Sequence, residues 1–209
     1  MTPNANEVNI LILNFVESTL LNLLNGNFEG NIKDFYERYD WNNKDYLSDA
    51  INIDYRIMRN DSYYLSIVFE GLCNHKTAAH PTDRFITLTI DKINKKIIFI
   101  DDLFRIDDFI QFLQSNYKEL VREGLARKFQ VSPDVINNDV VQIILDYTSD
   151  EELSKIKAKL TSNNEYYPFF LTDNAIGISI SIPFVLGDHF EILINYDELT
   201  KYLIDGVEL

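Results

Sequence analysis

The sequence contains a single cysteine, Cys73, and it is poor in glycine and proline, with 7 and 5 among 209 residues. One cysteine excludes an intrachain disulfide. Few glycines and prolines exclude collagen-like and linker-dominated chains. Cys73 lies in an apolar stretch, where a buried small hydrophobic residue is the ordinary role of a thiol. The compartment stays open, because cytosolic and exported bacterial domains can both lack disulfides.

Long apolar runs and a basic N-terminal segment are also missing. Asn9, Asn14 and Glu17 interrupt the stretch 8–24, so it falls short of the roughly 20 apolar residues that a membrane helix needs. No Lys or Arg precedes Lys33, whereas a secretory signal peptide begins with a basic region. We therefore expect no membrane-spanning segment in this chain.

Positive charge is scarce: 33 acidic residues face 19 basic ones, for a net charge of −14. A nucleic-acid-binding protein needs a basic face, and no basic run occurs, so we expect no nucleic-acid partner. The acidity has two interpretations, namely solubility and long-range attraction to a cationic partner. Apolar residues make up 46% of the chain, which is enough to bury a sizeable core.

Helices are expected where apolar residues recur at intervals of three and four. The segments are 6–24, 107–128 and 133–147, with shorter or capped helices at 32–39, 149–160 and 197–204. A strand at 140–145 is an alternative to the third helix, because that stretch is rich in β-branched residues. The expected core-facing residues are Leu13, Val16, Leu20, Leu23 and Leu24 in the first helix, Phe109, Ile110, Leu113, Tyr117, Leu120 and Val121 in the second, and Ile136, Val140, Ile143, Ile144 and Tyr147 in the third.

Strands are expected where apolar and polar residues alternate. The segments are 50–57, 63–72, 85–91, 97–100, 166–172, 175–182 and 190–196. Turn residues at Asn60-Asp61 and Asn94-Lys95-Lys96 predict that the first four strands form an antiparallel meander. The predicted fold class is α+β, with one or more antiparallel sheets and helices packed on one face. We interpret 1–60 as an N-terminal helix and first strand that belong to the same domain as an α+β region at 61–209.

The three histidines, His75, His80 and His189, are the first residues to consider for chemistry. His75 and His80 lie near each other, and a metal site shared with an aspartate is one hypothesis. No Cys-x-x-Cys or His-Glu-x-x-His pattern accompanies them. The opposite interpretation is that His80 is a loop residue whose ring bonds a backbone carbonyl, with Pro81 fixing the loop exit. We expect neither a metal site nor a cofactor.

Catalytic motifs are absent: the sequence has no Gly-x-Ser-x-Gly elbow, phosphate-binding glycine loop or dinucleotide fingerprint. The pair Asp101-Asp102 has an ordinary explanation at the end of a strand. Tyr63 lies at a strand start, and exposed aromatic residues of this kind are favoured at protein interfaces. The alternative is that the ring caps the core with its hydroxyl outward. Enzymatic activity stays uncertain, and the sequence favours a non-catalytic domain.

One stretch of the chain resembles a bacterial family of domains of unknown function. The segments that carry the likeness are Ser62–Glu70, Ala79-His80-Pro81, Phe85–Asp91 and Ile97–Phe104, followed by Phe169–Ile178, Ile182–Phe184, Gly187 and Ile192–Leu199. The family occurs in the ectodomains of RsiV-like anti-sigma factors, and related domains are attached to PdaC-type peptidoglycan deacetylases. The sequence departs from the family at Lys76-Thr77-Ala78 and at Asn94-Lys95, where the family has glycines.

The resemblance implies an extracytoplasmic, non-catalytic sensing or binding domain. In the RsiV-like branch the ligand is lysozyme, a very basic protein, which suits a charge of −14; peptidoglycan is the other ligand that the family implies. The candidate binding residues are His80, Pro81, His75, Tyr63, Asp101 and Asp102. Two alternatives stay open: a cytosolic immunity or adaptor protein, and a hydrolase that uses Asp101, Asp102 or His80.

Overall fold

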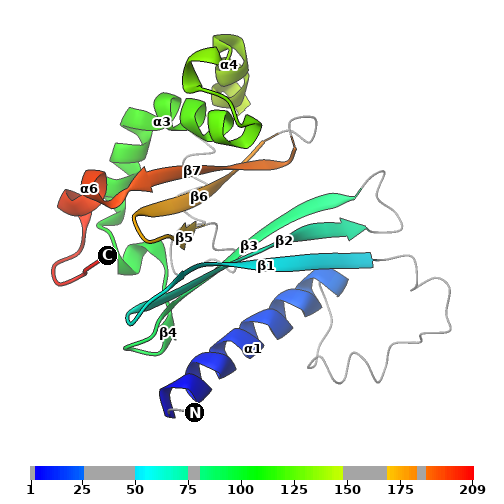
Figure 1. Ribbon diagram of the computed structural model, residues 1–209, viewed down its shortest axis with the longest axis vertical. Helices are drawn as coiled ribbons and strands as arrows, with labels where there is room; N and C mark the ends of the chain where they lie inside the picture. The colour runs from blue at the N-terminus through cyan, green and yellow to red at the C-terminus, as the bar shows by residue number, and fades with distance from the viewer. Residues whose placement is uncertain (1–2, 26–49, 75–80, 148–168, 183–186) are drawn as a thin grey trace.

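The computed structural model describes residues 3–25, 50–74, 81–147, 169–182 and 187–209. Two antiparallel sheets lie face to face, and each carries a helix on its outer side (Figure 1). The order of layers is helix, four-stranded sheet, three-stranded sheet and helices. This arrangement confirms the predicted α+β class.

The large sheet and its helix come first in the chain. Their elements are α1 (Pro3–Asn25), β1 (Ala50–Asn60), β2 (Tyr64–Asn74), β3 (Thr82–Asp91) and β4 (Lys96–Ile97). The strands are hydrogen-bonded in the order β1-β2-β3-β4, so the predicted meander is confirmed. Because β1 pairs with β2 along its whole length, the first strand is an integral part of the large sheet.

The second half of the chain builds the small sheet and its covering helices. Its elements are η1 (Ile100–Asp102), α3 (Ile106–Phe129), η2 (Pro133–Val135), α4 (Asn138–Tyr147), β5 (Phe169–Leu171), β6 (Ala175–Ser181), β7 (His189–Asn195), α6 (Tyr196–Leu199) and η4 (Thr200–Tyr202). The strand order is β5-β6-β7. No helix in the described ranges combines the length and apolar character needed to cross a membrane.

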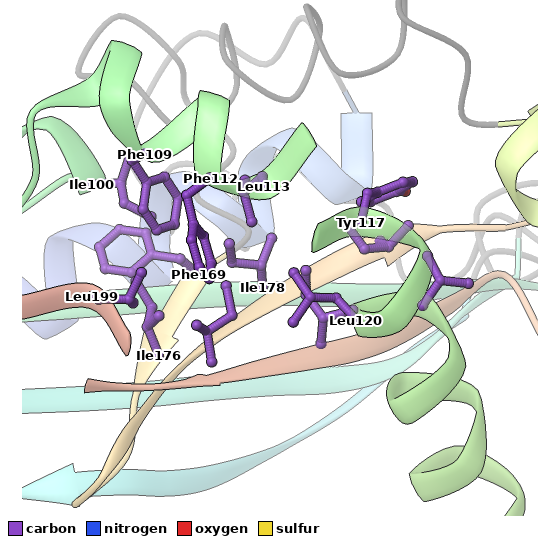
Figure 2. Packing of buried hydrophobic residues seen from close by; sticks show 14 of the residues in the cluster. Ile100, Phe109, Phe112, Leu113, Tyr117, Leu120, Phe169, Ile176, Ile178 and Leu199 are labelled. Carbon is purple, nitrogen blue, oxygen red and sulfur yellow. The ribbon is translucent and has the colours of Figure 1, made fainter. Parts of the chain in front are cut away.

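The larger core lies between the small sheet and α3. Figure 2 shows side chains of α3, including Phe109, Leu113 and Leu120, packed over Ile176 and Ile178 of β6. All six residues predicted to face the core from this helix are buried. Strand alternation explains why: every second residue of β6 and β7 points toward the helix, and those positions are apolar.

The smaller core lies between α1 and the outer face of the large sheet. Val8 and Phe15 of the helix pack with Leu65, Ile67 and Leu88 of the strands. Alternation places these strand residues on one face, while Ser66 and Val68 point to the other face, toward the small sheet. One face of the large sheet therefore packs against α1, and the other packs against the small sheet.

The interface between the two sheets is partly polar. Ser66 and Thr89 share a hydroxyl hydrogen bond of 2.9 Å, and the backbone N–H of Leu171 in β5 donates to the Ser66 Oγ at 2.9 Å. Beside this contact the ring of Phe170 lies over Gly177, in a space that no side chain at position 177 could share. Buried hydroxyl groups are stable here because they are hydrogen-bonded to each other and to β5.

A β-bulge aims Arg59 into the same interface. Ile57 pairs with Ile67 and Arg59 with Ser66, so Met58 is the extra residue of the bulge. Without the extra residue, Arg59 would point to the same outer face of the sheet as Ile57. The bulge turns Arg59 to the inner face. Only 8% of Arg59 is exposed, which makes it a buried cation that needs partners.

Those partners join the two sheets. The Arg59 Nε lies 2.5 Å from Asp61, and its Nη1 donates to the hydroxyl of Tyr196 at 3.3 Å. The guanidinium also lies over the rings of Tyr64 and Tyr196, 5.0 and 5.8 Å from their centroids. Tyr196 donates in turn to the carbonyl of Thr172 at 2.7 Å. We call Arg59, Asp61, Tyr64 and Tyr196 the arginine clamp.

Tyr196 gives the clamp a measurable pH dependence. Burial raises the pKa of Tyr196 from 10.0 to about 12, although the nearby Arg59 opposes the shift. A raised folded-state pKa means that the tyrosine contributes stability below pH 10 that is lost as the pH rises toward 12. We expect the free energy of unfolding of Tyr196→Phe to fall less steeply than that of the unaltered chain over this interval. Parallel urea titrations at several alkaline pH values measure the difference; identical slopes would contradict it.

Several details of the sequence prediction are corrected. Leu13 is 65% exposed and Ile143 is 54% exposed, while Phe15 and Val141 occupy the buried positions. The segment 140–145 is helical, so the strand alternative is wrong. The predicted helix at 133–147 is interrupted after η2, and the predicted strand at 97–100 is reduced to β4. The predicted helices at 32–39 and 149–160 lie outside the described residues.

Candidate functional site

A pocket of ≈ 340 Å³ lies at one end of the large sheet. Its walls come from the β1–β2 turn, the β3–β4 turn, η1 and the C-terminal segment. The lining residues are Tyr63, Tyr64, Asp91, Ile93, Asn94, Lys96, Ile98, Asp102, Leu103, Gly206, Val207 and Glu208. We call it the hairpin pocket.

Backbone and side-chain hydrogen bonds hold the two turns together. The Lys92 N–H donates to the Tyr63 carbonyl at 2.8 Å, and the Lys92 ammonium group donates to Asn60 Oδ1 at 3.2 Å and to the Asp61 carbonyl. Asp61 Oδ1 accepts from the N–H groups of Tyr63 and Tyr64, both at 2.7 Å. Burial alone would raise the pKa of Asp61, but these N–H groups and Arg59 outweigh it and lower the pKa. Tyr63 therefore stands on a rigid turn.

Two aspartates in the pocket are fixed by their own turns. Asp91 accepts from the N–H groups of Ile93 and Asn94 at 2.9 and 2.8 Å. Asp102 accepts from the Phe99 N–H at 2.8 Å and from the Lys96 ammonium group at 2.6 Å. These hydrogen bonds hold both side chains in place, so the pocket presents two acidic residues from fixed positions.

The rim of the pocket is apolar and exposed. Tyr63 is 54% exposed and Ile93 is 62% exposed. Among the lining residues, the carboxylates of Asp91, Asp102 and Glu208 outnumber the single ammonium group of Lys96. An exposed aromatic beside fixed carboxylates is a surface that suits a cationic side chain of a partner.

A second cluster lies where the two sheets meet, and we call it the junction cluster. It consists of Arg56 on β1, Glu70 on β2, and His189 and Glu191 on β7. Arg56 donates to both oxygens of Glu70, at 2.6 and 3.1 Å, and to Glu191 Oε1 at 3.2 Å. The ring of Phe85 packs against the imidazole of His189, with centroids 4.7 Å apart.

Burial shifts the pKa values of His189 and Glu191 in the junction cluster. Burial lowers the pKa of His189, and the nearby Lys128 ammonium group lowers it further. Burial raises the pKa of Glu191, while Arg56 opposes the rise. At neutral pH the imidazole is therefore uncharged. A pocket of ≈ 210 Å³ opens beside it, lined by Gly124, Arg127, Lys128, His189, Phe190, Glu191 and Leu193.

Comparison with known proteins identifies the fold. No protein-family model matches the sequence, and no curated protein matches it. A DUF3298 family protein from Pseudomonas aeruginosa has a similar structure, with a TM-score of 0.53 and 14% identity over 91% of this chain and 77% of that one. A member of the DUF3298 family from Bacteroides fragilis has a TM-score of 0.45 and 17% identity over 83% of this chain, which spans 61% of that protein. The chain has the fold of a DUF3298 protein.

DUF3298 denotes a family of unknown function, so the likeness to the Pseudomonas aeruginosa protein extends to the fold alone. It agrees with the predicted resemblance to a domain family of unknown function. The finer assignment to an RsiV-like or PdaC-type branch stays a prediction.

The DUF3298 fold brings some predicted binding residues together and separates others. Tyr63 and Asp102 line the hairpin pocket, and the half-buried Asp101 precedes Asp102 in η1. Pro81 is exposed and directly precedes β3, at the opposite end of the large sheet. The length of β2 separates the two ends by roughly 30 Å. His75 and His80 lie outside the described residues.

The junction cluster was not predicted from the sequence. One signal was present: His189 and Glu191 are two apart on a strand, so alternation places both on one face. Glu70 gave no signal, because its proximity to Glu191 arises from the packing of one sheet on the other. Arg56, which contacts both carboxylates, is likewise recognised only once the sheets are assembled.

Proposed function

We propose that the chain is a non-catalytic, extracytoplasmic binding domain that recognises a basic protein through the hairpin pocket. The observation that carries the proposal is the combination of the exposed Tyr63 ring with fixed carboxylates in a pocket of ≈ 340 Å³. Pockets of this size usually accommodate a ligand or a protruding part of one. A partner with a flat surface would leave the pocket empty.

The pocket favours a lysine or arginine side chain. Its aliphatic stem can pack on Tyr63 and Ile93 at the rim, while its charged end meets Asp91 and Asp102. Hydrogen bonds from backbone N–H groups hold both aspartates in place before any ligand arrives, and such preorganisation reduces the entropy lost on binding.

The charge of the whole chain supports the same class of partner. A net charge of −14 attracts a cationic protein over distances beyond direct contact and accelerates encounter. The resemblance to RsiV-like ectodomains makes lysozyme the first basic protein to test.

The roles of the acidic residues support binding rather than hydrolysis. Asp102 uses one oxygen for the Phe99 N–H and the other for Lys96. A general acid or base must exchange a proton with the substrate, whereas both oxygens of Asp102 already accept hydrogen bonds from groups of the chain itself. These contacts favour a positioning role for Asp102 over proton transfer.

Titration calorimetry with hen lysozyme tests the proposal. We expect saturable binding at low ionic strength that weakens by about tenfold or more between 0.05 and 0.3 M salt. Succinylated lysozyme, in which lysine charges are reversed, is the matched control and is expected not to bind. Absence of heat with native lysozyme, or equal binding of the succinylated form, would contradict recognition of a basic protein. Heat from muropeptides alone would point to a glycan ligand instead.

The location of the protein is tested separately. We expect an antibody against the chain to detect it in the cell-envelope or secreted fraction of the source cells. Detection in the cytosolic fraction alone would overturn the extracytoplasmic part of the proposal and favour a cytosolic adaptor or immunity protein.

A further inference from the structure

The junction cluster brings together three groups that can each bind a metal ion. Glu70, His189 and Glu191 each offer one ligand atom, and these atoms all lie within 4.8 Å of one another. The three side chains are half-buried. None of them lines the hairpin pocket, so the cluster is a separate site.

The backbone aims these groups at a common point. His189 and Glu191 project from the same face of β7, because Phe190 between them points toward α3, where it packs against Gly124. Glu70 projects from the inner face of β2, opposite Phe85 of β3. Since Phe85 also packs against the imidazole of His189, the histidine ring is supported from the side of the large sheet.

The distances allow a metal ion after a small adjustment. Three atoms that all lie within 4.8 Å of one another have a common centre at most about 2.8 Å from each of them, whereas zinc–nitrogen and zinc–oxygen bonds measure about 2.0–2.2 Å. Each ligand atom must therefore move inward by at most about 0.7 Å, which small rotations of the two glutamate side chains and of the imidazole supply. The adjoining pocket of ≈ 210 Å³ has room for water at the remaining coordination position.

Arg56 already binds two of the three groups. Its guanidinium bridges Glu70 and Glu191, as a metal ion would, and its positive charge offsets the repulsion between the two carboxylates. The Arg56 side chain is 48% exposed, so it can turn toward solvent when another cation takes its place. A metal ion and Arg56 are therefore competitors for the same carboxylates.

We propose that Glu70, His189 and Glu191 form a binding site for a divalent transition metal of the zinc class, and that Arg56 bridges the carboxylates in the metal-free protein. One imidazole nitrogen and two carboxylate oxygens are a donor set that suits Zn²⁺. Ca²⁺ and Mg²⁺ prefer sites made of oxygen alone, so they serve as negative controls.

The Lys128 ammonium group donates to the backbone carbonyls of His189 and Gly187, at 2.5 and 3.3 Å, rather than to the imidazole. Three cations, Arg56, Arg127 and Lys128, lie near the site and weaken its affinity for a metal ion. Removal of Arg56, which forms ion pairs with both carboxylate ligands, is expected to increase that affinity.

Calorimetric titration of the chelator-treated full chain with ZnCl₂ tests the proposal. We expect one saturable site in the unaltered chain, and binding at least about tenfold weaker in His189→Ala and in Glu191→Gln. The isosteric Glu191→Gln keeps the side-chain shape, and circular dichroism checks that each variant is folded. Arg56→Gln is expected to bind Zn²⁺ about tenfold more tightly, because the competing cation is gone. The double variant His75→Ala/His80→Ala, which removes the other histidines, is expected to leave this site unchanged.

Three results would overturn the site. The first is no Zn²⁺ binding by either the unaltered chain or Arg56→Gln. The second is unchanged affinity in both His189→Ala and Glu191→Gln. The third is loss of binding in the double histidine variant, which would place the metal elsewhere. None of these results depends on lysozyme binding, so the metal site and the proposed function are tested independently.

Discussion

Gly177→Ala is expected to lower the free energy of unfolding by about 3 kcal/mol. A Cβ at this position would lie 2.1 Å from the nearest ring carbon of Phe170, and the next two closest atoms belong to the same ring. Phe170 is fully buried, so its ring cannot move into solvent. The cost is therefore expected at the upper end of the range for overpacked cores. Urea denaturation followed by circular dichroism measures it.

A double-mutant cycle shows whether this steric conflict is the cause. In the Phe170→Leu background the smaller side chain leaves room for a methyl group at position 177. The combined loss is expected to be smaller than the sum of the two single losses by at least about 1 kcal/mol. Additive losses would mean that the two positions do not share the space and that the sheets are packed differently.

Arg59→Met is the second large effect, and we expect it to cost about 2 kcal/mol of stability. Methionine keeps much of the apolar volume between Tyr64 and Tyr196 but removes the charge and the hydrogen bonds to Asp61 and Tyr196. The loss is moderated because the Asp61 side chain is 37% exposed and regains water. The midpoint and slope of urea unfolding supply the measurement.

Arg56→Met is the matched control, since Arg56 lies on the same strand and also forms ion pairs. Its side chain is 48% exposed, and exposed ion pairs contribute about 0–1 kcal/mol. We therefore expect Arg56→Met to change stability by less than about 1 kcal/mol. An equal loss in both variants would show that the arginine clamp has no special role in joining the sheets.

Sequence periodicity predicted the elements that have one clear apolar face. The helix α3 is such a case, because its buried residues recur at helical spacing and alternate with charged ones. The helix α1 is different: Leu11, Ile12 and Leu13 are consecutive apolar residues, so the pattern does not decide which of them faces the sheet. Leu13 was predicted to be buried and is exposed.

The contacts between the sheets could not be predicted from the pattern. A single extra residue at Met58 reverses the direction of Arg59, and periodicity contains no signal for a bulge. The pairing of Phe170 with Gly177 depends on the register of β5 against β6. Strand ends were also less certain, because the chain leaves the ladder after Ile97 to form η1.

The candidate site was predicted in part. Tyr63 and Asp102 were chosen for separate reasons, one as an exposed aromatic and the other as a member of an acidic pair, and the fold places both in one pocket. Gly206, Val207 and Glu208 of the C-terminal segment form another wall of that pocket. Their proximity depends on the hydrogen bond from the Tyr64 hydroxyl to the Glu208 carbonyl at 3.2 Å, a contact between distant parts of the sequence.

The central claim is that the hairpin pocket is where a basic protein binds, and lysozyme affinity of Tyr63→Ala tests it most directly. Tyr55→Ala is the matched control, because Tyr55 is 62% exposed, compared with 54% for Tyr63, and lies on β1 outside the pocket. We expect Tyr63→Ala to weaken binding by at least about tenfold, as for a central aromatic contact, and Tyr55→Ala to leave it unchanged. Unchanged binding in Tyr63→Ala, or a larger loss in Tyr55→Ala, would contradict the claim.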